Sequence, residues 1–418
     1  MQTDPSAHSM NSGQASSGQV FCRNEPTVLH IDLNSCFATI EQQANPFWRG
    51  KPLAVAAYDS PRGCIIAASV EAKKTGIKVG MRVGEGKIIF PRLVVVTPDP
   101  DKYRAVHKQL LRILENYDPE PYAKSIDEFV LKPVRGAIKK VGQEIKNRLK
   151  DEVGEWMRAS VGISTNRWLA KMAAGQVKPD GLTVIDKSNF LEYYRKWQLT
   201  DLTGIKNANM VRLNRLGIFT TMDFYKAEVG KLRAAFEAIT GYYWHLRLRG
   251  LEPDKEEWGR KSFGNSFALP KPFSQLVNLA PILMKLTEKM AFRMRRAGYC
   301  TNGIHVGILY RDGSFWHKGR KLFTECFDSR ELYQKAVKLL AGSNLGKPVH
   351  TLSVSCFDLV EKKNTQLSLL DDRIKSEKFI KAVDNINERW GDFVISPARM
   401  LGIGDYVKDR VGFGNIGI

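Results

Sequence analysis

The first half of the chain alternates apolar runs with helical patterns in a way that predicts one sheet. Residues 27–34 are an apolar run that predicts a buried strand. Apolar residues at helical spacing predict helices over 101–117 and 138–157, and a further strand is expected over 159–164. With a hairpin between the two helices, this order predicts a ferredoxin-like layout, a single sheet with helices on one face.

Shorter elements follow the first predicted strand. Residues 35–47 read as a helix that Pro46 ends. Residues 51–97 alternate short apolar runs with a short helix over 70–75, which predicts a small separate module.

The second half of the chain predicts another α/β region, after a charged linker at 251–259. Strands are expected over 263–269, 303–310, 315–323 and 349–359, and helices over 275–297 and 330–340.

The net charge of the chain limits the class of molecule that it is expected to bind. Lys and Arg number 64 against 44 Asp and Glu, a net charge of +20, and residues 260–350 hold 16 of the former and five of the latter, a net +11. Such a balance indicates a polyanionic partner, either nucleic acid or an anionic membrane surface, and the single-sign field over residues 260–350 favours a surface that binds phosphates. With 418 residues and 43% hydrophobic residues, two to four domains with real cores are expected.

The sequence argues against a disulfide-bonded, zinc-binding or membrane-spanning protein. The six cysteines lie far apart, without CxxC or zinc spacing, which indicates reduced thiols in a cytoplasmic protein. The seven histidines are scattered, so a histidine-based metal site is not expected. No apolar run is long enough for a transmembrane helix, and residues 1–24 read as a disordered leader.

Three acidic residues carry the candidate chemistry. Asp127 and Glu128 follow Ser125-Ile126 between strand-like flanks, and Asp32 closes the apolar run 27–34. Neighbouring side chains of a strand point to opposite faces, so Asp127 and Glu128 reach one point only at a strand end or turn. Three carboxylates there would hold two divalent cations for phosphoryl transfer. The alternative is an acidic pair on a solvated turn.

Asp32-Leu33-Asn34-Ser35-Cys36-Phe37, followed by the Ser-Ile-Asp-Glu tetrad, resembles the Y-family of lesion-bypass DNA polymerases, over residues 27 to 404. The resemblance implies an α+β, multi-domain right-hand polymerase. Its implied parts are a disordered leader (1–24), a ferredoxin-like palm (25–35 and 98–174), small fingers (36–97), a helical thumb (175–250), a linker (251–259), an α/β little finger (260–360) and a tail (361–418).

The resemblance also implies the reaction. Asp32, Asp127 and Glu128, with the carbonyl of Leu33, would hold two Mg²⁺, for which Mn²⁺ can substitute, and deoxynucleotides would be added to a primer on template DNA. Low fidelity, lesion bypass and absence of proofreading are expected. The alternatives are another two-metal palm enzyme, such as a nucleotidyl cyclase, and a catalytically inactive DNA-binding scaffold.

Four residues are the implied nucleotide contacts. Phe37 would be the steric gate that excludes a 2′-hydroxyl, although a plain core role is the alternative. Arg167 and Lys171 would face the triphosphate. Lys73 stands where many relatives have Arg on the short fingers helix, and it lacks the bidentate fork of Arg. This departure resembles the polymerase V catalytic-subunit branch more than the polymerase IV branch.

The implied DNA contacts lie further along the chain. Residues 199–224 resemble a helix-hairpin-helix in which the Gly204 turn presents N–H groups to a phosphate and Lys206 replaces the usual second glycine. The expected contacts of the little finger are Lys261, Arg293, Arg320 and Lys321.

The tail contains a peptide that resembles the bacterial sliding-clamp-binding motif. Gln366 would fix its orientation, and Leu367, Leu369 and Leu370 would fill an apolar groove. The alternative is that these leucines begin the helix expected over 371–390.

Overall fold

The computed structural model describes residues 21–254, 260–362, 373–404, 406 and 407. They divide into two compact units, one on each side of residues 255–259, and each unit has its own hydrophobic core. Among the residues described, no helix is long and apolar enough to cross a membrane. The predicted leader (apart from 21–24) and clamp-binding residues Gln366, Leu367, Leu369 and Leu370 lie outside the described residues.

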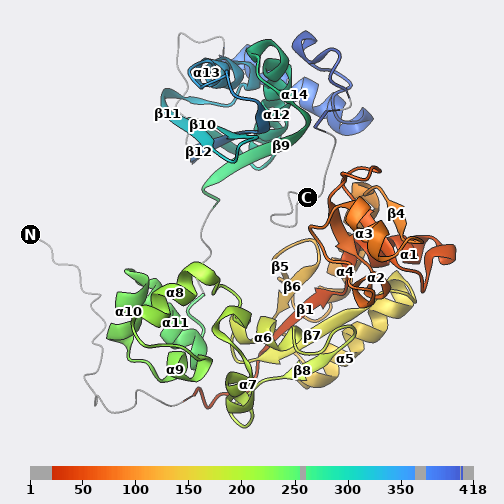
Figure 1. The fold of residues 1–418 in the computed structure, drawn as a ribbon, viewed down its shortest axis with the longest axis vertical. Helices are drawn as coiled ribbons and strands as arrows, with labels where there is room; N and C mark the ends of the chain where they lie inside the picture. The colour runs from red at the N-terminus through yellow and green to blue at the C-terminus, as the bar shows by residue number, and fades with distance from the viewer. Residues whose placement is uncertain (1–20, 255–259, 363–372, 405, 408–418) are drawn as a thin grey trace, which may run out of the picture. The chain divides into compact units, whose positions relative to one another are not determined.

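A five-stranded sheet organises the first unit. Figure 1 shows β1 between β6 and β7, in the order β5-β6-β1-β7-β8. The strands are β1 (Val28–Leu33), β5 (Tyr122–Ala123), β6 (Glu128–Leu131), β7 (Ala159–Ser164) and β8 (Leu182–Val184). The predicted strands over 27–34 and 159–164 are confirmed, as is the hairpin between the helices.

Helices cover both faces of this sheet. Leu29, Ile31 and Leu33 point into a core formed with α1 (Cys36–Ala44), α4 (Pro100–Leu114) and α5 (Ile138–Arg148). On the other face of β1, Val28 packs on Ala170 of α6 (Arg167–Ala174). The two helices of the predicted ferredoxin-like layout, α4 and α5, lie on one face of the sheet, as expected. The second face is covered by α6, which follows β7 and lies outside that layout.

Close backbone contact fixes α6 on the sheet. An added Cβ at Gly162 of β7 would lie 2.0 Å from the carbonyl oxygen of Ala170, a separation no side chain allows. Glycine at this position therefore lets α6 approach the strands that carry the acids.

The predicted helix over 138–157 ends early. α5 stops at Arg148 and continues as a π-helical turn, η2 (Leu149–Val153). The turn closes where the amide of Gly154 donates to the carbonyl of Leu149, the five-residue spacing of a π turn.

The predicted small module over 51–97 contains a three-stranded sheet of order β3-β2-β4. Its elements are β2 (Leu53–Ala56), β3 (Ile65–Ala68), α2 (Val70–Lys74), α3 (Val83–Ile89) and β4 (Val94–Val96), and the 3₁₀ turn η1 (Pro46–Trp48) precedes them. Helix α3 was not predicted, because Gly84 and Gly86 weaken its pattern. The amide of Arg82 donates to the Glu85 carboxylate at 3.1 Å and caps this helix.

Short helices follow the sheet in the first unit. They are α7 (Phe190–Lys196), η3 (Leu199–Asp201), α8 (Asn207–Arg215), α9 (Thr221–Lys226), α10 (Val229–Phe236) and α11 (Thr240–Leu248). Gly204 has φ of 101° in the turn before α8. The helix expected before this turn is reduced to the 3₁₀ turn η3, so the helix-hairpin-helix is shortened.

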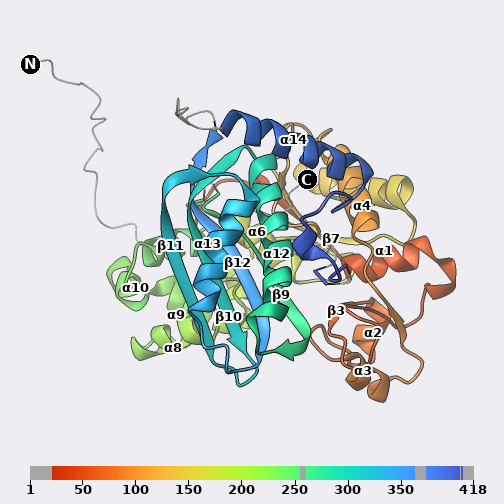
Figure 2. The ribbon, with the colours of Figure 1, turned by 90° about the horizontal axis from the view of Figure 1, so that it is seen from above.

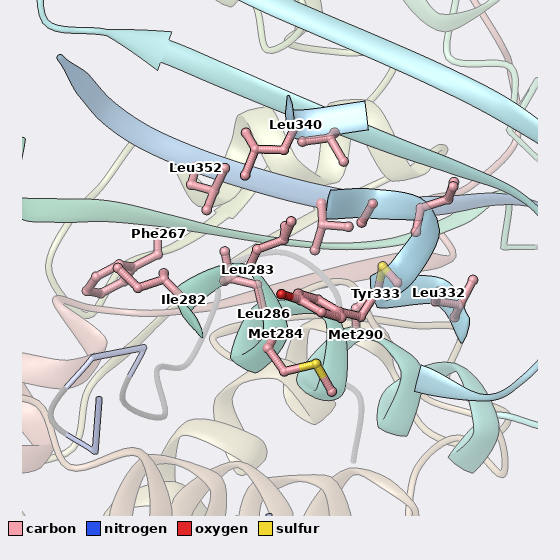
Figure 3. Close-up of a cluster of buried hydrophobic side chains, with 14 of the residues drawn as sticks. Phe267, Ile282, Leu283, Met284, Leu286, Met290, Leu332, Tyr333, Leu340 and Leu352 are labelled. Carbon is pink, nitrogen blue, oxygen red and sulfur yellow. The ribbon is translucent and has the colours of Figure 1, made fainter. Parts of the chain in front are cut away.

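The second unit is a four-stranded antiparallel sheet of order β11-β10-β12-β9. Its elements are β9 (Ser262–Phe273), α12 (Leu276–Arg296), β10 (Tyr299–Tyr310), β11 (Phe315–Cys326), α13 (Ser329–Ala341) and β12 (Val349–Glu361). In Figure 2, α12 and α13 lie together over the sheet. Figure 3 shows Phe267, Leu283, Leu340 and Leu352 from four of these elements meeting in its core. All six predicted elements are confirmed.

A helical extension packs on the second unit. It contains α14 (Arg373–Trp390) and the 3₁₀ turn η5 (Ala398–Met400). The Arg295 guanidinium of α12 makes two 2.7 Å hydrogen bonds to the Asp384 carboxylate of α14. Met400 is buried in the core of the unit.

Candidate active site

Two carboxylates meet across neighbouring strands. Asp32, near the end of β1, and Glu128, at the start of β6, are register partners in the antiparallel pair. Partners of this kind stand side by side on one face of a sheet. Both side chains are 18% exposed, so the charges are partly removed from water but accessible.

Asp127 lies in the turn that leads into β6. The Ser125 hydroxyl donates to Asp127 Oδ1 at 2.6 Å and accepts the Glu128 amide at 3.1 Å. The Leu33 amide donates to the Asp127 carbonyl at 2.9 Å, which ties this turn to the strand of Asp32. The tetrad is therefore a hydrogen-bonded turn that holds Asp127 close to the facing pair.

Two lysines neutralise the facing carboxylates. Lys171 of α6 places its Nζ 2.7 Å from both carboxylate oxygens of Glu128. Lys178, in the loop after α6, places its Nζ 2.7 Å from Asp32 Oδ2. A cation on each carboxylate offsets the repulsion between acids that stand this close.

Burial and mutual repulsion raise the pKa of both Asp32 and Asp127. Burial raises the pKa of the Asp32 carboxyl, and Lys178 opposes this effect. Burial also raises the pKa of Asp127, the Ser125 hydroxyl opposes it, and the charges of Asp32 and Glu128 add to the rise. A positive charge beside these carboxyls opposes the rise in pKa and favours their ionised form.

The donor set fits a divalent cation. His30, Asp32 and Glu128 each offer an atom within 4.8 Å of the others' atoms. Two carboxylates, with Asp127 beside them, are the oxygen ligands that hard cations such as Mg²⁺ and Mn²⁺ take. The lysines at the same oxygens show that the site accommodates positive charge.

Comparison with known proteins gives the family. The impB/mucB/samB family model matches residues 31–175, and the model of its C-terminal domain matches residues 260–369. The DNA polymerase IV of Moorella thermoacetica is 31% identical over 90% of this chain and 96% of that protein. The DNA polymerase IV of Pelotomaculum thermopropionicum is 30% identical over 92% and 98%. A solved Y-family DNA polymerase chimera of Dbh and Dpo4 has a TM-score of 0.71 and 25% identity, covering 80% of this chain and 99% of that one.

The chain belongs to the Y-family of DNA polymerases. It is a DNA-directed DNA polymerase of the translesion class, and it has the mixed α and β fold of that family. The predicted family, fold class and activity are confirmed, and these matches favour neither the inactive scaffold nor the cyclase. Enzymes of this family use divalent metal ions, which agrees with the donor set of the acids.

Phe37 of the polymerase lies on the first turn of α1, as predicted, and is 2% exposed. Its ring stacks on Tyr103 of α4, with ring centroids 4.3 Å apart. The Tyr103 hydroxyl donates to the Glu41 carboxylate at 2.8 Å. Phe37 is thus buried in the core against Tyr103, and its role as a sugar gate stays a prediction.

The other predicted nucleotide contacts separate into two groups. Lys73 of the short helix α2 donates to the Ser35 hydroxyl at 2.8 Å, and burial followed by the charge of Lys178 lowers the pKa of Lys73. Lys73 is therefore brought to the acids, as Lys171 is. Arg167 instead stacks on Tyr122 at 5.3 Å, and its amide donates to the Glu252 carboxylate at 2.8 Å. The structure therefore places Arg167 against the start of the linker.

Sequence reasoning missed two residues at the acids. Lys178 was not predicted. It begins a Lys-Pro-Asp-Gly turn directly after the helix that carries Lys171, and this position could have indicated a second lysine near the acids. His30 is fully buried two residues before Asp32, and neither ring nitrogen finds a hydrogen-bond partner in the described part of the chain. Burial, and then the charge of Lys171, lowers its pKa well below the usual value, so His30 is neutral.

The predicted DNA contacts are spread over both units. Lys206 is exposed at the start of α8, next to the Gly204 turn. In the second unit Lys261, Arg293, Arg320 and Lys321 are all exposed. Arg320 and Lys321 are adjacent on the edge strand β11, so they project from opposite faces of it.

Proposed function

We propose that Asp32, Asp127 and Glu128 of this polymerase hold two Mg²⁺ ions, with the Leu33 carbonyl as a further ligand, and that the enzyme adds deoxynucleotides to a primer on template DNA. The observation that carries the proposal is the pairing of Asp32 with Glu128 across β1 and β6, with Asp127 in the adjoining turn. Bound metal ions supply an activated primer hydroxyl and neutralise charge on the triphosphate.

The residues around the acids each have a defined task. Ser125 orients the Asp127 carboxylate, and the strand pairing orients Asp32 and Glu128 toward the same point. Lys171 and Lys178 neutralise the Glu128 and Asp32 carboxylates. Metal ions held by the acids would take over this role. Lys178, whose side chain is 42% exposed, and Lys73 would then be available to contact the triphosphate.

Phe37 is proposed as the gate against ribonucleotides, since it begins the helix directly after the strand of Asp32. Its stacking on Tyr103 gives the ring a fixed position against which a 2′-hydroxyl would clash. Arg167 is proposed to approach the triphosphate only when its contacts with the start of the linker open.

DNA phosphates are proposed to contact the Gly204 turn, Lys206 and the exposed cations of the second unit. This assignment is supported by their exposure and by the net charge of +11 over residues 260–350. Such an enzyme would work in the cytoplasm, on chromosomal DNA.

The assignment of the acids is tested by Asp127→Ala. Loss of one carboxylate removes several kcal/mol of transition-state stabilisation, so primer extension with Mg²⁺ should fall by at least about a thousandfold. Affinity for primer-template, measured by fluorescence anisotropy, should stay within about twofold of the parent, because the acid does not bind phosphate. Asp101→Ala removes a carboxylate that is 94% exposed on α4 and serves as the control. Extension by Asp127→Ala at a tenth of the parental rate or more would contradict the metal assignment.

We further propose that Gln366, Leu367, Leu369 and Leu370 bind a sliding clamp, as the sequence of the tail suggests. Tethering of this kind raises the local concentration of the enzyme on DNA without changing its chemistry. The double substitution Gln366→Ala with Leu369→Ala should leave distributive synthesis unchanged and remove stimulation by a loaded clamp. Unchanged stimulation of the double variant would place the clamp contact elsewhere.

A further inference from the structure

The loop after α6 carries Lys178 to the acids. It joins α6 to β8 and includes residues 175–181, and the Lys178 ammonium reaches Asp32 at 2.7 Å. A long lysine side chain has high conformational entropy, so its position depends on how firmly its backbone is held. The backbone of this loop is held at several points that lie outside the catalytic acids.

One set of contacts ties the loop to the strands beneath it. The Ser160 hydroxyl of β7 donates to the Val177 carbonyl at 2.9 Å and accepts the Gly181 amide at 3.3 Å. The side-chain oxygen of Asn34 accepts the Asp180 amide at 2.7 Å, and its amide nitrogen donates to Ser160 at 3.0 Å. Asn34 is two residues beyond Asp32, so these hydrogen bonds hold the loop at a fixed position relative to the strand that carries Asp32.

A second set of contacts converges on the Asp180 side chain. Lys150 Nζ lies 2.8 Å from Asp180 Oδ2, and Lys146 Nζ lies 3.4 Å from Oδ1 and 2.6 Å from the Asp180 carbonyl. Arg158 Nε lies 3.9 Å from Oδ2. Three cations from α5, η2 and the segment before β7 thus surround one carboxylate.

Asp180 is held in an unfavourable backbone conformation. Its φ of 60° lies in the left-handed region, which a non-glycine residue keeps only where surrounding contacts fix it. The Lys146 side chain is 6% exposed, and a buried ammonium of this kind requires a charged partner. The buried Lys146 ammonium and the strained backbone of Asp180 therefore both fix the position of this loop. The same loop carries Lys178, whose side chain reaches the active site.

We propose that Asp180 is a positioning residue for the polymerase reaction, acting through Lys178. Its ion pairs with Lys146 and Lys150 fix the loop so that the Lys178 ammonium is presented beside Asp32, where the triphosphate of the incoming nucleotide binds. This inference rests on the triphosphate role given to Lys178 in the proposed function.

The positioning role has a specific kinetic signature. Without the Asp180 anchor, Lys178 keeps its charge but loses its fixed position, so nucleotide binding weakens. DNA binding stays unchanged, because none of these residues is assigned to DNA. Since Asp180 acts only through Lys178, its removal should have no further effect once Lys178 is gone.

The test uses the full-length enzyme in single-turnover primer extension, which separates the Kd of the deoxynucleoside triphosphate from the rate of incorporation. Asp180→Asn removes the charge but suits the left-handed backbone. Lys178→Met should raise the nucleotide Kd by about tenfold, as expected for one lost charge-assisted contact. Asp180→Asn should raise it by about three- to tenfold, and the double variant by no more than Lys178→Met alone.

Lys150→Met weakens the same anchor from its exposed side and is the second variant if Asp180→Asn does not fold. It should raise the nucleotide Kd in the same direction. Glu25→Gln, which removes an exposed ion pair with Lys187, is the control and should change neither constant.

Two results would overturn the inference alone, and a third would overturn it together with the proposed function. One is a double variant whose defect is the product of the single defects, which would show that Asp180 acts independently of Lys178. The other is a nucleotide Kd that rises in Lys178→Met but stays parental in folded Asp180→Asn or Lys150→Met. If Lys178→Met itself leaves the nucleotide Kd unchanged, the triphosphate role of Lys178 in the proposed function is wrong, and the inference falls with it.

Discussion

At the scale of single residues, the active site is organised by pairing acids with lysines. Lys171 donates to both oxygens of Glu128 and Lys178 donates to one oxygen of Asp32, and these cations offset the repulsion between the closely spaced acids. On the apolar side of the same strand, Phe37 and Tyr103 stack on each other in the core that contains Leu33. The residues proposed to contact phosphate and the residue proposed to contact the sugar therefore come from opposite sides of β1 and the helix that follows it.

Phe37→Ala is the residue-scale test of sugar selection. If the ring excludes a 2′-hydroxyl, its removal should raise ribonucleotide incorporation by at least about a hundredfold relative to deoxynucleotide incorporation, since a steric clash of roughly 3 kcal/mol is relieved. The efficiencies for the two nucleotides are measured on the same primer-template. Tyr103→Phe, which keeps the stacked ring and loses only the hydroxyl bond to Glu41, is the control. A parental ratio in Phe37→Ala, with the melting temperature lowered, would make Phe37 a core residue only.

At the scale of elements, the helices carry out two different tasks. α6 packs on the sheet so closely that Gly162 is required beneath it, and this places Lys171 over Glu128. α14 instead contacts the second unit through polar side chains. The Arg295–Asp384 pair joins it to α12 with side chains only 12% and 20% exposed, whereas Arg296 and Glu388 are 3.5 Å apart and half exposed.

Asp384→Asn should therefore loosen α14. Loss of the bidentate, partly buried pair should cost about 2 kcal/mol of local stability, because the Arg295 guanidinium loses two charge-assisted hydrogen bonds. Hydrogen exchange of the α14 amides is the measurement, and faster exchange confined to this helix is expected. Glu388→Gln, at the exposed pair, should change local stability by less than about 0.5 kcal/mol. Equal exchange in the two variants would show that apolar contacts, not the ion pair, hold the helix.

At the scale of the whole molecule, charge is distributed unevenly along the chain. Residues 260–350 hold +11 of the total of +20, while the acids that are proposed to bind metal lie in the first unit. The chemistry and the main electrostatic attraction to DNA are therefore assigned to separate units. This division lets DNA affinity be changed without changing the acids.

Salt dependence tests that division. If about six phosphates are neutralised, primer-template affinity of the parent should fall by roughly a thousandfold between 50 and 200 mM salt. Arg320→Ala combined with Lys321→Ala should reduce the slope of log affinity against log salt by about two, and leave the rate of incorporation at saturating DNA unchanged. Asp312→Asn, an exposed acid paired with Lys347 in the same unit, is the control. An unchanged slope would place the phosphate contacts elsewhere.

Sequence alone determined the order of the elements and the identity of the acids. Strands β1 and β7, the helices α4 and α12 and the strands of the second unit follow from apolar periodicity, which is a local property of the chain. The tetrad at 125–128 indicated a turn because Asp127 and Glu128 are adjacent. Helix α3, rich in glycine, and the π-helical end of α5 escaped this reasoning.

Only the tertiary structure decided which side chains meet. The register of β1 with β6 sets Asp32 opposite Glu128, and a shift of one residue would have turned one carboxylate to the other face. The close approach of α6 brings Lys171 to Glu128, and the anchored loop brings Lys178 to Asp32 from 146 residues away in sequence. Arg167, on the same helix as Lys171, instead contacts residues near 252. Such pairings depend on strand register and on backbone packing between distant segments. Neither can be predicted from the periodicity of apolar residues, because periodicity reports only local structure.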